Sequence, residues 1–223
     1  MTHAYAAPGN YTVTVKVEDG KGGSVTSTVA VTVVAGGGVI AGDTDSDGDG
    51  FSDQIETALG TNPYSAASAP AGVTKPEKTG KLSVSKLGIK LSFAKPNSDA
   101  IGMSGLLLIP DGFTVAGQTV IVDIGGVVKS FTLDPKGKSP KGNDSIAVGV
   151  KAGKTGTPLQ VAKFAVKLMK GSFAAALLDD GLVNATTTAQ VTVPVTVIFN
   201  AETLQKAVAQ SYKASAGKGG ATK

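Results

Sequence analysis

The second half of the chain is a succession of short apolar segments separated by turn residues, and this pattern limits the fold more than any other feature. The segments are rich in Val, Ile, Leu and Thr, and several alternate apolar with polar residues, which is typical of β-strands. The loops between them carry Gly, Pro, Asn and Asp, the residues that favour tight turns. We predict seven strands, at 82–94, 103–110, 119–126, 127–134, 145–151, 161–169 and 191–199. Such a series predicts a β-sandwich domain over residues 81–216.

Residues 201–213 can be interpreted in two ways. Leu204, Val208 and Tyr212 fall at helical spacing, whereas a return strand would pair with residues 191–199 across a turn. The neighbourhood consists of strands, which favours the second interpretation. The last residues, 217–223, form a tail of mostly Gly and Lys that we expect to be mobile in isolation, unless contacts with another segment order it.

The first 35 residues contain two alternating segments around a glycine-rich turn. One face of the first segment carries Tyr11, Val13, Val15 and Val17. This pattern predicts a β-hairpin, and an isolated hairpin is barely stable in water. Residues 1–35 therefore need further strands, supplied either by sequence upstream or by a neighbouring subunit.

An acidic stretch follows a glycine-rich segment. Residues 43–56 contain six of the 17 acidic residues of a chain whose net charge is +4. Counting from Asp45 matches the D-x-D-x-D-G-x5-E pattern of a calcium loop, with Gly50 at position 6 and Glu56 at position 12. Ca²⁺ prefers six to eight oxygen ligands, and without a cation these carboxylates would repel one another. The predicted calcium ligands are Asp45, Asp47, Asp49, Phe51 (through its carbonyl), Asp53 and Glu56, with Asp43 as an outer or alternative ligand.

A single short helix is predicted beside this loop. Residues 53–59 can form a helix that stops at Gly60, and the Gly- and Val-rich residues before Asp45 predict no entering helix. A paired calcium sensor is therefore not expected. We interpret residues 36–80 as a linker that contains the calcium loop and stiffens the joint between two β modules.

Two segments resemble known families. His3, Tyr5, Pro8-Gly9 and the alternating valines that follow resemble the end of a PKD repeat, an immunoglobulin-like sandwich common in secreted and cell-surface proteins. Residues 43–63, DTDSDGDGFSDQIETALGTNP, resemble bacterial thrombospondin type-3-like repeats, in which calcium rigidifies linkers of exported proteins. The resemblances imply a bacterial protein that is extracellular or at the cell surface. The expected fold class is all-β: immunoglobulin-like strands and a C-terminal β-sandwich, joined by an EF-hand-like calcium loop.

Composition argues against two kinds of partner. All 21 basic residues are lysine, and lysine lacks the forked geometry with which arginine binds phosphates and bases, so nucleic acid is not expected. The longest uncharged run, residues 22–42, alternates Val with Thr and Ala before a triple glycine. This run predicts a strand followed by a linker, with no membrane insertion.

Catalytic constellations are also missing from the sequence. His3 is the one histidine, so a serine nucleophile has no obvious base. Asp123 lies in an apolar segment, Asp179 and Asp180 precede a turn glycine, and residues 149–155 have one residue too few for a phosphate-binding loop. We therefore predict no enzyme activity.

We predict a non-enzymatic calcium-binding structural protein, a filament, sheath or surface-layer subunit that joins copies of itself by β-strand addition. The alternative is an adhesion or polysaccharide-anchoring module of a larger secreted enzyme, with a cell-surface polysaccharide as partner.

Overall fold

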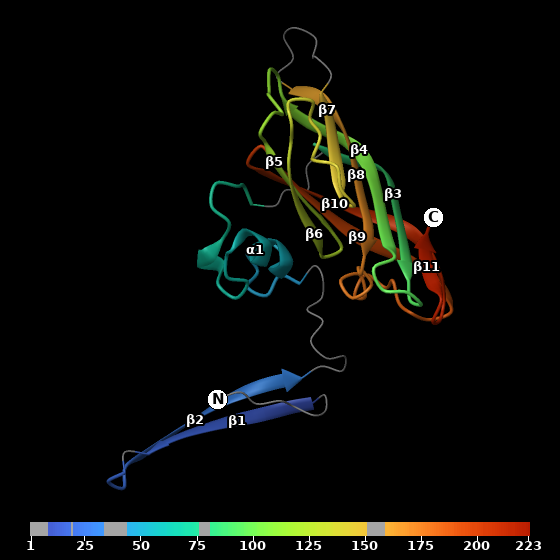
Figure 1. Cartoon of the computed structure of the whole chain (residues 1–223). Helices are drawn as coiled ribbons and strands as arrows, with labels where there is room; N and C mark the ends of the chain where they lie inside the picture. The colour runs from blue at the N-terminus through green and yellow to red at the C-terminus, as the bar shows by residue number, and fades with distance from the viewer. Residues whose placement is uncertain (1–8, 19, 34–43, 76–80, 151–158) are drawn as a thin grey trace. The chain divides into compact units, whose positions relative to one another are not determined.

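A computed structural model of the chain describes residues 9–18, 20–33, 44–75, 81–150 and 159–223 (Figure 1). The chain divides into two compact units, residues 1–39 and 40–223. The described part is mostly β, with one α-helix and a large antiparallel sheet, which confirms the predicted fold class.

The described part of the N-terminal unit is a two-stranded ribbon. Strands β1 (Gly9–Glu18) and β2 (Ser24–Val33) pair antiparallel over their whole length, as the hairpin prediction requires. Val15, Val17 and Val25 are 54%, 65% and 72% exposed, because a two-stranded ribbon cannot cover its own side chains. The need for further strands stays a prediction.

The C-terminal unit contains one nine-stranded sheet with the strand order β6-β5-β9-β10-β11-β3-β4-β8-β7. All its pairings are antiparallel. The strands are β3 (Leu82–Ser92), β4 (Asp99–Pro110), β5 (Thr119–Ile124), β6 (Val127–Thr132), β7 (Ser145–Val150), β8 (Leu159–Gly171), β9 (Thr187–Phe199), β10 (Glu202–Ser215) and β11 (Gly219–Thr222).

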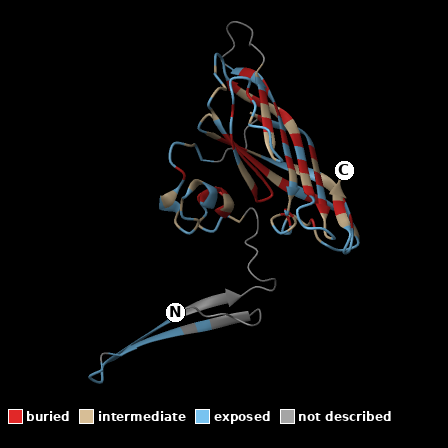
Figure 2. Cartoon of the chain, viewed as in Figure 1, coloured by how far each residue is buried: buried red, intermediate tan, exposed pale blue. Residues whose placement is uncertain are grey.

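The two halves of this sheet share one core. Figure 1 shows the ribbons of β9 and β10 crossing those of β3, β4 and β8. Phe164 on β8 and Val193 on β9 belong to the same cluster of buried apolar residues. Burial alternates along β8, so this strand turns one face toward the core and the other outward (Figure 2). The sandwich is therefore a continuous sheet folded over, with the short strand β11 where its halves join.

All seven predicted strands are present as β3 to β9, and residues 202–215 form β10, which returns beside β9. The expected mobile tail instead contains β11, which pairs with β10 and β3. Its glycines are required by close packing. A Cβ on Gly219 would lie 2.6 Å from the Leu91 carbonyl oxygen, and one on Gly220 would lie 2.1 Å from the Tyr212 hydroxyl. Propensity alone disfavours a Gly-rich strand, so only tertiary packing identifies β11.

The segment predicted as a linker is largely part of the C-terminal unit. We call residues 44–75 the acidic repeat, and its helix α1 (Asp53–Leu59) lies beside β5 and β6 in Figure 1. Phe51 and Ile55 pack with Ile121 of β5 and Ile198 of β9 in a second apolar cluster. The acidic repeat therefore covers the outer face of the sheet there and is not a free joint.

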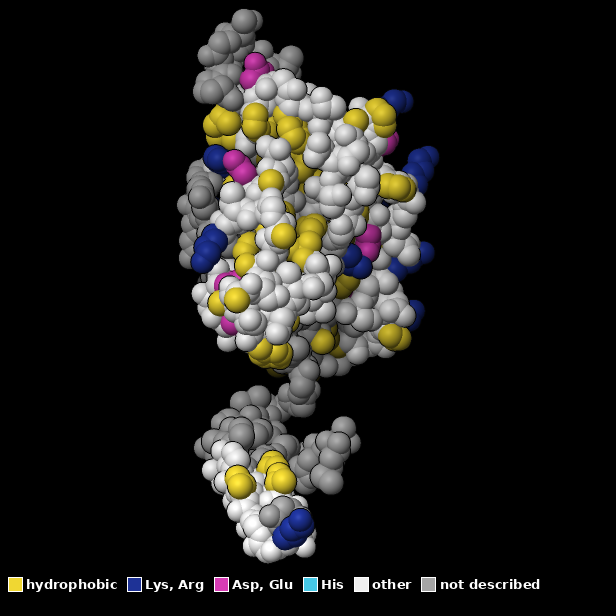
Figure 3. Space-filling view, turned by 90° about the vertical axis from the view of Figure 1, so that its left-hand side faces the viewer, with side chains coloured by type: hydrophobic (Ala, Val, Ile, Leu, Met, Phe, Trp, Pro, Cys, Tyr) yellow, Lys and Arg dark blue, Asp and Glu magenta, His cyan; other side chains and the backbone are white. Residues whose placement is uncertain are grey.

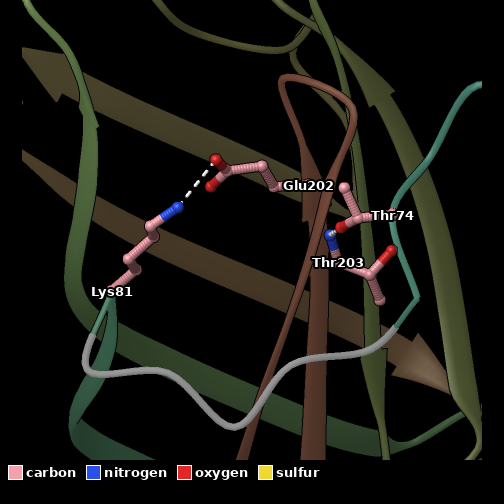
Figure 4. Close-up of polar contacts among 4 residues, drawn as sticks. All are labelled: Thr74, Lys81, Glu202 and Thr203. Carbon is pink, nitrogen blue, oxygen red and sulfur yellow. Dashed lines mark hydrogen bonds and ion pairs between the residues drawn. The ribbon is translucent and has the colours of Figure 1, made fainter.

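The end of the acidic repeat is tied to the same sheet by hydrogen bonds (Figure 4). The Thr74 N–H donates to the carbonyl of Ala201 at 2.9 Å, and the Thr74 hydroxyl accepts from the Thr203 N–H at 3.1 Å. Nearby, Lys81 forms a 2.8 Å ion pair with Glu202. The first residues of β10 thus contact segments on both sides of residues 76–80.

Candidate metal centre

The acidic loop is shaped by its own carboxylates. Asp45 accepts hydrogen bonds from the N–H groups of Gly48 and Gly50, both at 2.8 Å. Asp49 accepts from the Phe51 N–H at 2.9 Å. Gly50 has φ of 102°, a conformation that favours glycine, as expected for the sharp turn at position 6. The loop therefore has the backbone course that the calcium-loop pattern predicts.

Several carboxylate oxygens converge without a partner of their own. Ligand atoms of Asp45, Asp47 and Asp49 lie within 4.8 Å of one another. Asp47 Oδ2, Asp49 Oδ2 and Glu56 Oε2 are buried and accept no hydrogen bond from the described residues. Burying such oxygens unpaired is unfavourable, and a hard divalent cation is the partner that an all-oxygen donor set fits. The residues present therefore fit Ca²⁺.

Glu56 closes the loop from the first turn of α1. Its side chain is fully buried, and Oε1 accepts a 3.1 Å hydrogen bond from the Thr61 hydroxyl. Burial raises the pKa of Glu56, the charges of Asp49 and Asp47 raise it further, and the Thr61 hydrogen bond opposes the rise. A bound cation would favour the ionised form of this carboxyl.

Helix α1 begins and ends where the sequence predicts. Ser52 caps its N-terminus by accepting a hydrogen bond from the Ile55 N–H at 3.3 Å. Gly60 ends it in the left-handed conformation, with φ of 77°, and the Thr61 N–H donates to the Glu56 carbonyl. The caps fix Glu56 at the end of the loop while Ile55 faces the sheet.

All seven predicted ligands stay predictions, and three of them differ from the four carboxylates described above. Both carboxylate oxygens of Asp53 accept hydrogen bonds from Ser46, one from its N–H at 2.9 Å and one from its hydroxyl at 2.8 Å. Asp53 therefore stabilises the start of the loop, and its role as a ligand, direct or through water, stays a prediction. The Phe51 side chain is buried on the sheet, and its carbonyl remains a predicted ligand. Asp43 lies outside the described residues.

One residue that holds the site in place was not predicted for that role. The Ser52 hydroxyl donates to Asp123 Oδ2 at 2.9 Å, and Asp123 Oδ1 accepts from the Gly126 N–H at 2.8 Å. Asp123 is only 4% exposed. This carboxylate links the helix cap to the β5–β6 hairpin. Its signal in the sequence was a lone charge within a continuous apolar strand.

The remaining candidates are not among the residues that shape the acidic loop. Asp180 precedes a turn in which the Gly181 N–H donates to the Leu178 carbonyl, as predicted. His3 and residues 151–155 lie outside the described residues. None of the helices formed by the described residues is long and apolar enough to span a membrane.

Comparison with known families identifies two parts of the chain. Residues 45–66 match the model of the bacterial TSP3 repeat, and residues 1–33 match the model of a PKD domain. These matches confirm both resemblances. TSP3 repeats are associated with calcium binding, and both families are typical of extracellular, usually non-catalytic modules. No curated protein and no solved structure matched the chain.

Proposed function

We propose that this chain is a non-enzymatic calcium-binding structural protein of the cell surface, in which calcium locks the acidic repeat onto the C-terminal sheet. The observation that carries the proposal is the set of three buried, unpartnered oxygens on Asp47, Asp49 and Glu56. A cation bound there fixes the loop in the conformation that the apolar contacts of Phe51 and Ile55 also require. Ion binding and docking of α1 therefore stabilise each other.

The test compares thermal unfolding and protease cleavage with calcium and with EDTA. At calcium 100 times above the dissociation constant, ligand linkage stabilises the folded state by about 2.7 kcal/mol. We expect EDTA to lower the melting temperature and to expose residues 36–80 to protease. Asp47→Ala should give the chelated behaviour in calcium, whereas Asp179→Ala, at an exposed acid outside the repeat, should not. Identical melting and cleavage in calcium and EDTA would refute the proposal.

We further propose, more specifically, that the protein assembles with copies of itself into a filament, sheath or surface layer. The support for this assembly is the β1–β2 ribbon, whose exposed Val15, Val17 and Val25 favour burial against added strands. Electron microscopy of the purified protein with calcium tests it. Ordered polymers are expected, and particles that stay monomeric at all concentrations would contradict assembly.

The second candidate function is an adhesion or polysaccharide-anchoring module of a larger secreted protein. It is favoured by a row of shallow, lysine-lined hollows on the C-terminal sheet. A measured affinity for a polysaccharide would distinguish it from a purely structural role.

A further inference from the structure

The outer face of β3, β4 and β8 carries one lysine in each of four successive cross-strand rows. The strand register defines the rows, because residues paired side by side point to the same face. The rows are Lys90–Ala100–Met169, Gly88–Gly102–Lys167, Lys86–Ser104–Ala165 and Ser83–Leu106–Lys163. All four lysines are exposed, and most of their neighbours are Gly, Ala or Ser.

A β-bulge places one of these lysines outside. The pairing of β3 with β4 shifts register between Val84 and Lys86. Without the extra residue, the alternation that turns Val84 inward would also turn Lys86 toward the core. The bulge lets Val84 pack against the core while Lys86 stays exposed. The β-bulge thus keeps all four lysines on the outer face of the sheet.

The lysines form two lines that flank the central strand. They alternate between β3 and β8 from row to row, and β4 runs between them. Neighbouring strands lie about 4.8 Å apart, so the two lines are roughly 10 Å apart, with rows about 7 Å apart along the strands. Ala100, Gly102 and Ser104 give β4 a low surface between the lines. A chain-like ligand lying on β4 would therefore meet positive charge on alternate sides.

Three shallow hollows lie on this face, and two of the four lysines of the rows, Lys90 and Lys167, line them. Hollows of about 520, 360 and 330 Å³ follow one another across the sheet, and Lys167 lines the first two while Lys90 lines the last two. We call the three together the lysine groove. Its other lysines are Lys138, Lys141, Lys213 and Lys218. None of the residues that line the groove is acidic, so no neighbouring carboxylate in its walls offsets the positive charge.

The excess of positive charge is confined to the groove and does not extend over the whole C-terminal unit. Acidic and basic side chains lie near one another on the face of the C-terminal unit that Figure 3 turns toward the viewer. At the margin of the groove, Asp144 is already paired with Lys129 at 2.8 Å. A single-sign surface of this kind attracts a partner of opposite charge and raises its association rate.

We propose that the lysine groove binds an acidic polysaccharide, a chain of sugars bearing carboxylate or sulfate groups. The inference rests on the second proposed function, anchoring to a polysaccharide, and names its chemical class. The flat floor of small residues lets a sugar chain approach the sheet, and the flexible lysines can reach anionic groups at varied spacing. The groove is lined by residues of β3, β4, β7, β8, β10 and β11 and of the loop before β7, whereas the acidic repeat docks on β5, β6 and β9, so calcium is not required for binding.

Other polyanions fit the groove less well. Its walls contain no aromatic side chain on which a nucleic-acid base could stack, and the chain has no arginine for base edges. Binding to an anionic membrane surface favours bulky apolar residues that insert between lipids. In the central hollow, Ile89 and Ile101 are buried and face inward, so Met169 is the largest apolar side chain on its surface.

Isothermal titration calorimetry with hyaluronan and dextran sulfate tests the proposal, with neutral dextran as the control ligand. The variant Lys90→Gln/Lys167→Gln removes the two lysines shared between hollows. Lys136→Gln/Lys206→Gln, at exposed sites outside the groove, removes the same charge. We expect the groove variant to lose about tenfold in affinity and the control variant to lose less than about twofold. The groove variant should also show a weaker dependence of affinity on salt.

Each alternative result decides against a specific part of the proposal. Equal losses in both variants would show that only net charge matters, which overturns the groove. Binding of neutral dextran that neither variant alters would overturn the groove but leave polysaccharide anchoring intact. No binding of any polysaccharide, in calcium or in EDTA, would refute both. Tighter, groove-dependent binding of duplex DNA or of phosphatidylserine vesicles would assign the site to that other polyanion.

Discussion

Strand β5 and the second half of β9 are buried on both faces, whereas β8 in the same sheet buries one face and exposes the other. The difference comes from what packs on the outside. Phe51 and Ile55 of the acidic repeat cover Ile121 and Ile198, and none of the described residues covers the outer face of β8 in this way. The sequences reflect this, because VIVDI is apolar on both faces apart from Asp123, whereas QVAKFAVK alternates.

The two regions also differ in the burial and hydrogen bonding of their charged side chains. The one carboxylate on β5, Asp123, is buried and accepts hydrogen bonds from Ser52 and Gly126. On β8, Lys163 and Lys167 stay exposed to solvent. A charge under a covering element must be paired, whereas a charge on an open face is available to a partner. The covered region therefore supports the fold, and the open region is free to bind.

The largest expected effect comes from uncovering β5 and β9. Phe51→Ala removes a side chain that is 1% exposed, and such truncations cost about 3–5 kcal/mol of the free energy of unfolding. Val161→Ala on the open face of β8, where Val161 is 39% exposed, should cost less than about 1 kcal/mol. Urea denaturation of both variants in calcium measures the difference. Similar costs at the two sites would show that the acidic repeat adds little to the sheet.

A smaller effect is expected from the hydrogen bonds between α1 and β5. Ser52→Ala removes the helix cap and leaves Asp123 with one hydrogen-bond donor fewer, at a cost of about 1–2 kcal/mol. Because the cap positions Glu56, calcium affinity should fall as well. Titration with calcium, followed by melting, checks both effects. Ser130→Ala, at an exposed site on β6, is the matched control and should behave like the unmodified chain.

The smallest effect is a pH dependence seen only without calcium. Burial raises the pKa of Glu56 above its ordinary value of 4.5, so in the folded chain its ionised form is unfavourable. Its contribution to stability is full below that ordinary pKa and is lost as pH rises through the raised pKa. In EDTA at neutral pH, Glu56→Gln should therefore melt higher than the unmodified chain, and the gain should vanish in mild acid. A gain independent of pH would show that Glu56 does not titrate in this range.

Much of the fold could be predicted from local patterns. The strands β3 to β10 follow apolar periodicity and turn residues, and the end of α1 follows from Gly60, because turns and helix ends depend on near neighbours in the chain. The loop from Asp45 to Glu56 was recognisable for the same reason, since its spacing positions the carboxylates.

The features that could not be predicted depend on residues far apart in the sequence. Strand β11 forms because glycines fit against Leu91 and Tyr212, a requirement invisible in GGAT alone. The role of Asp123 depends on Ser52, 71 positions away. The lysine groove exists only through the register of β3, β4 and β8.

The sequence by itself therefore determined most of the elements and the spacing of the carboxylates in the acidic loop, because strand periodicity, helix ends and side-chain spacing in a loop are local properties of the chain. Only the tertiary structure decided that the acidic repeat covers β5 and β9, that the open face of β8 gathers lysines from two strands, and that the tail is a strand. The physical reason is that burial and cross-strand register are set by contacts between distant segments, which local patterns do not encode.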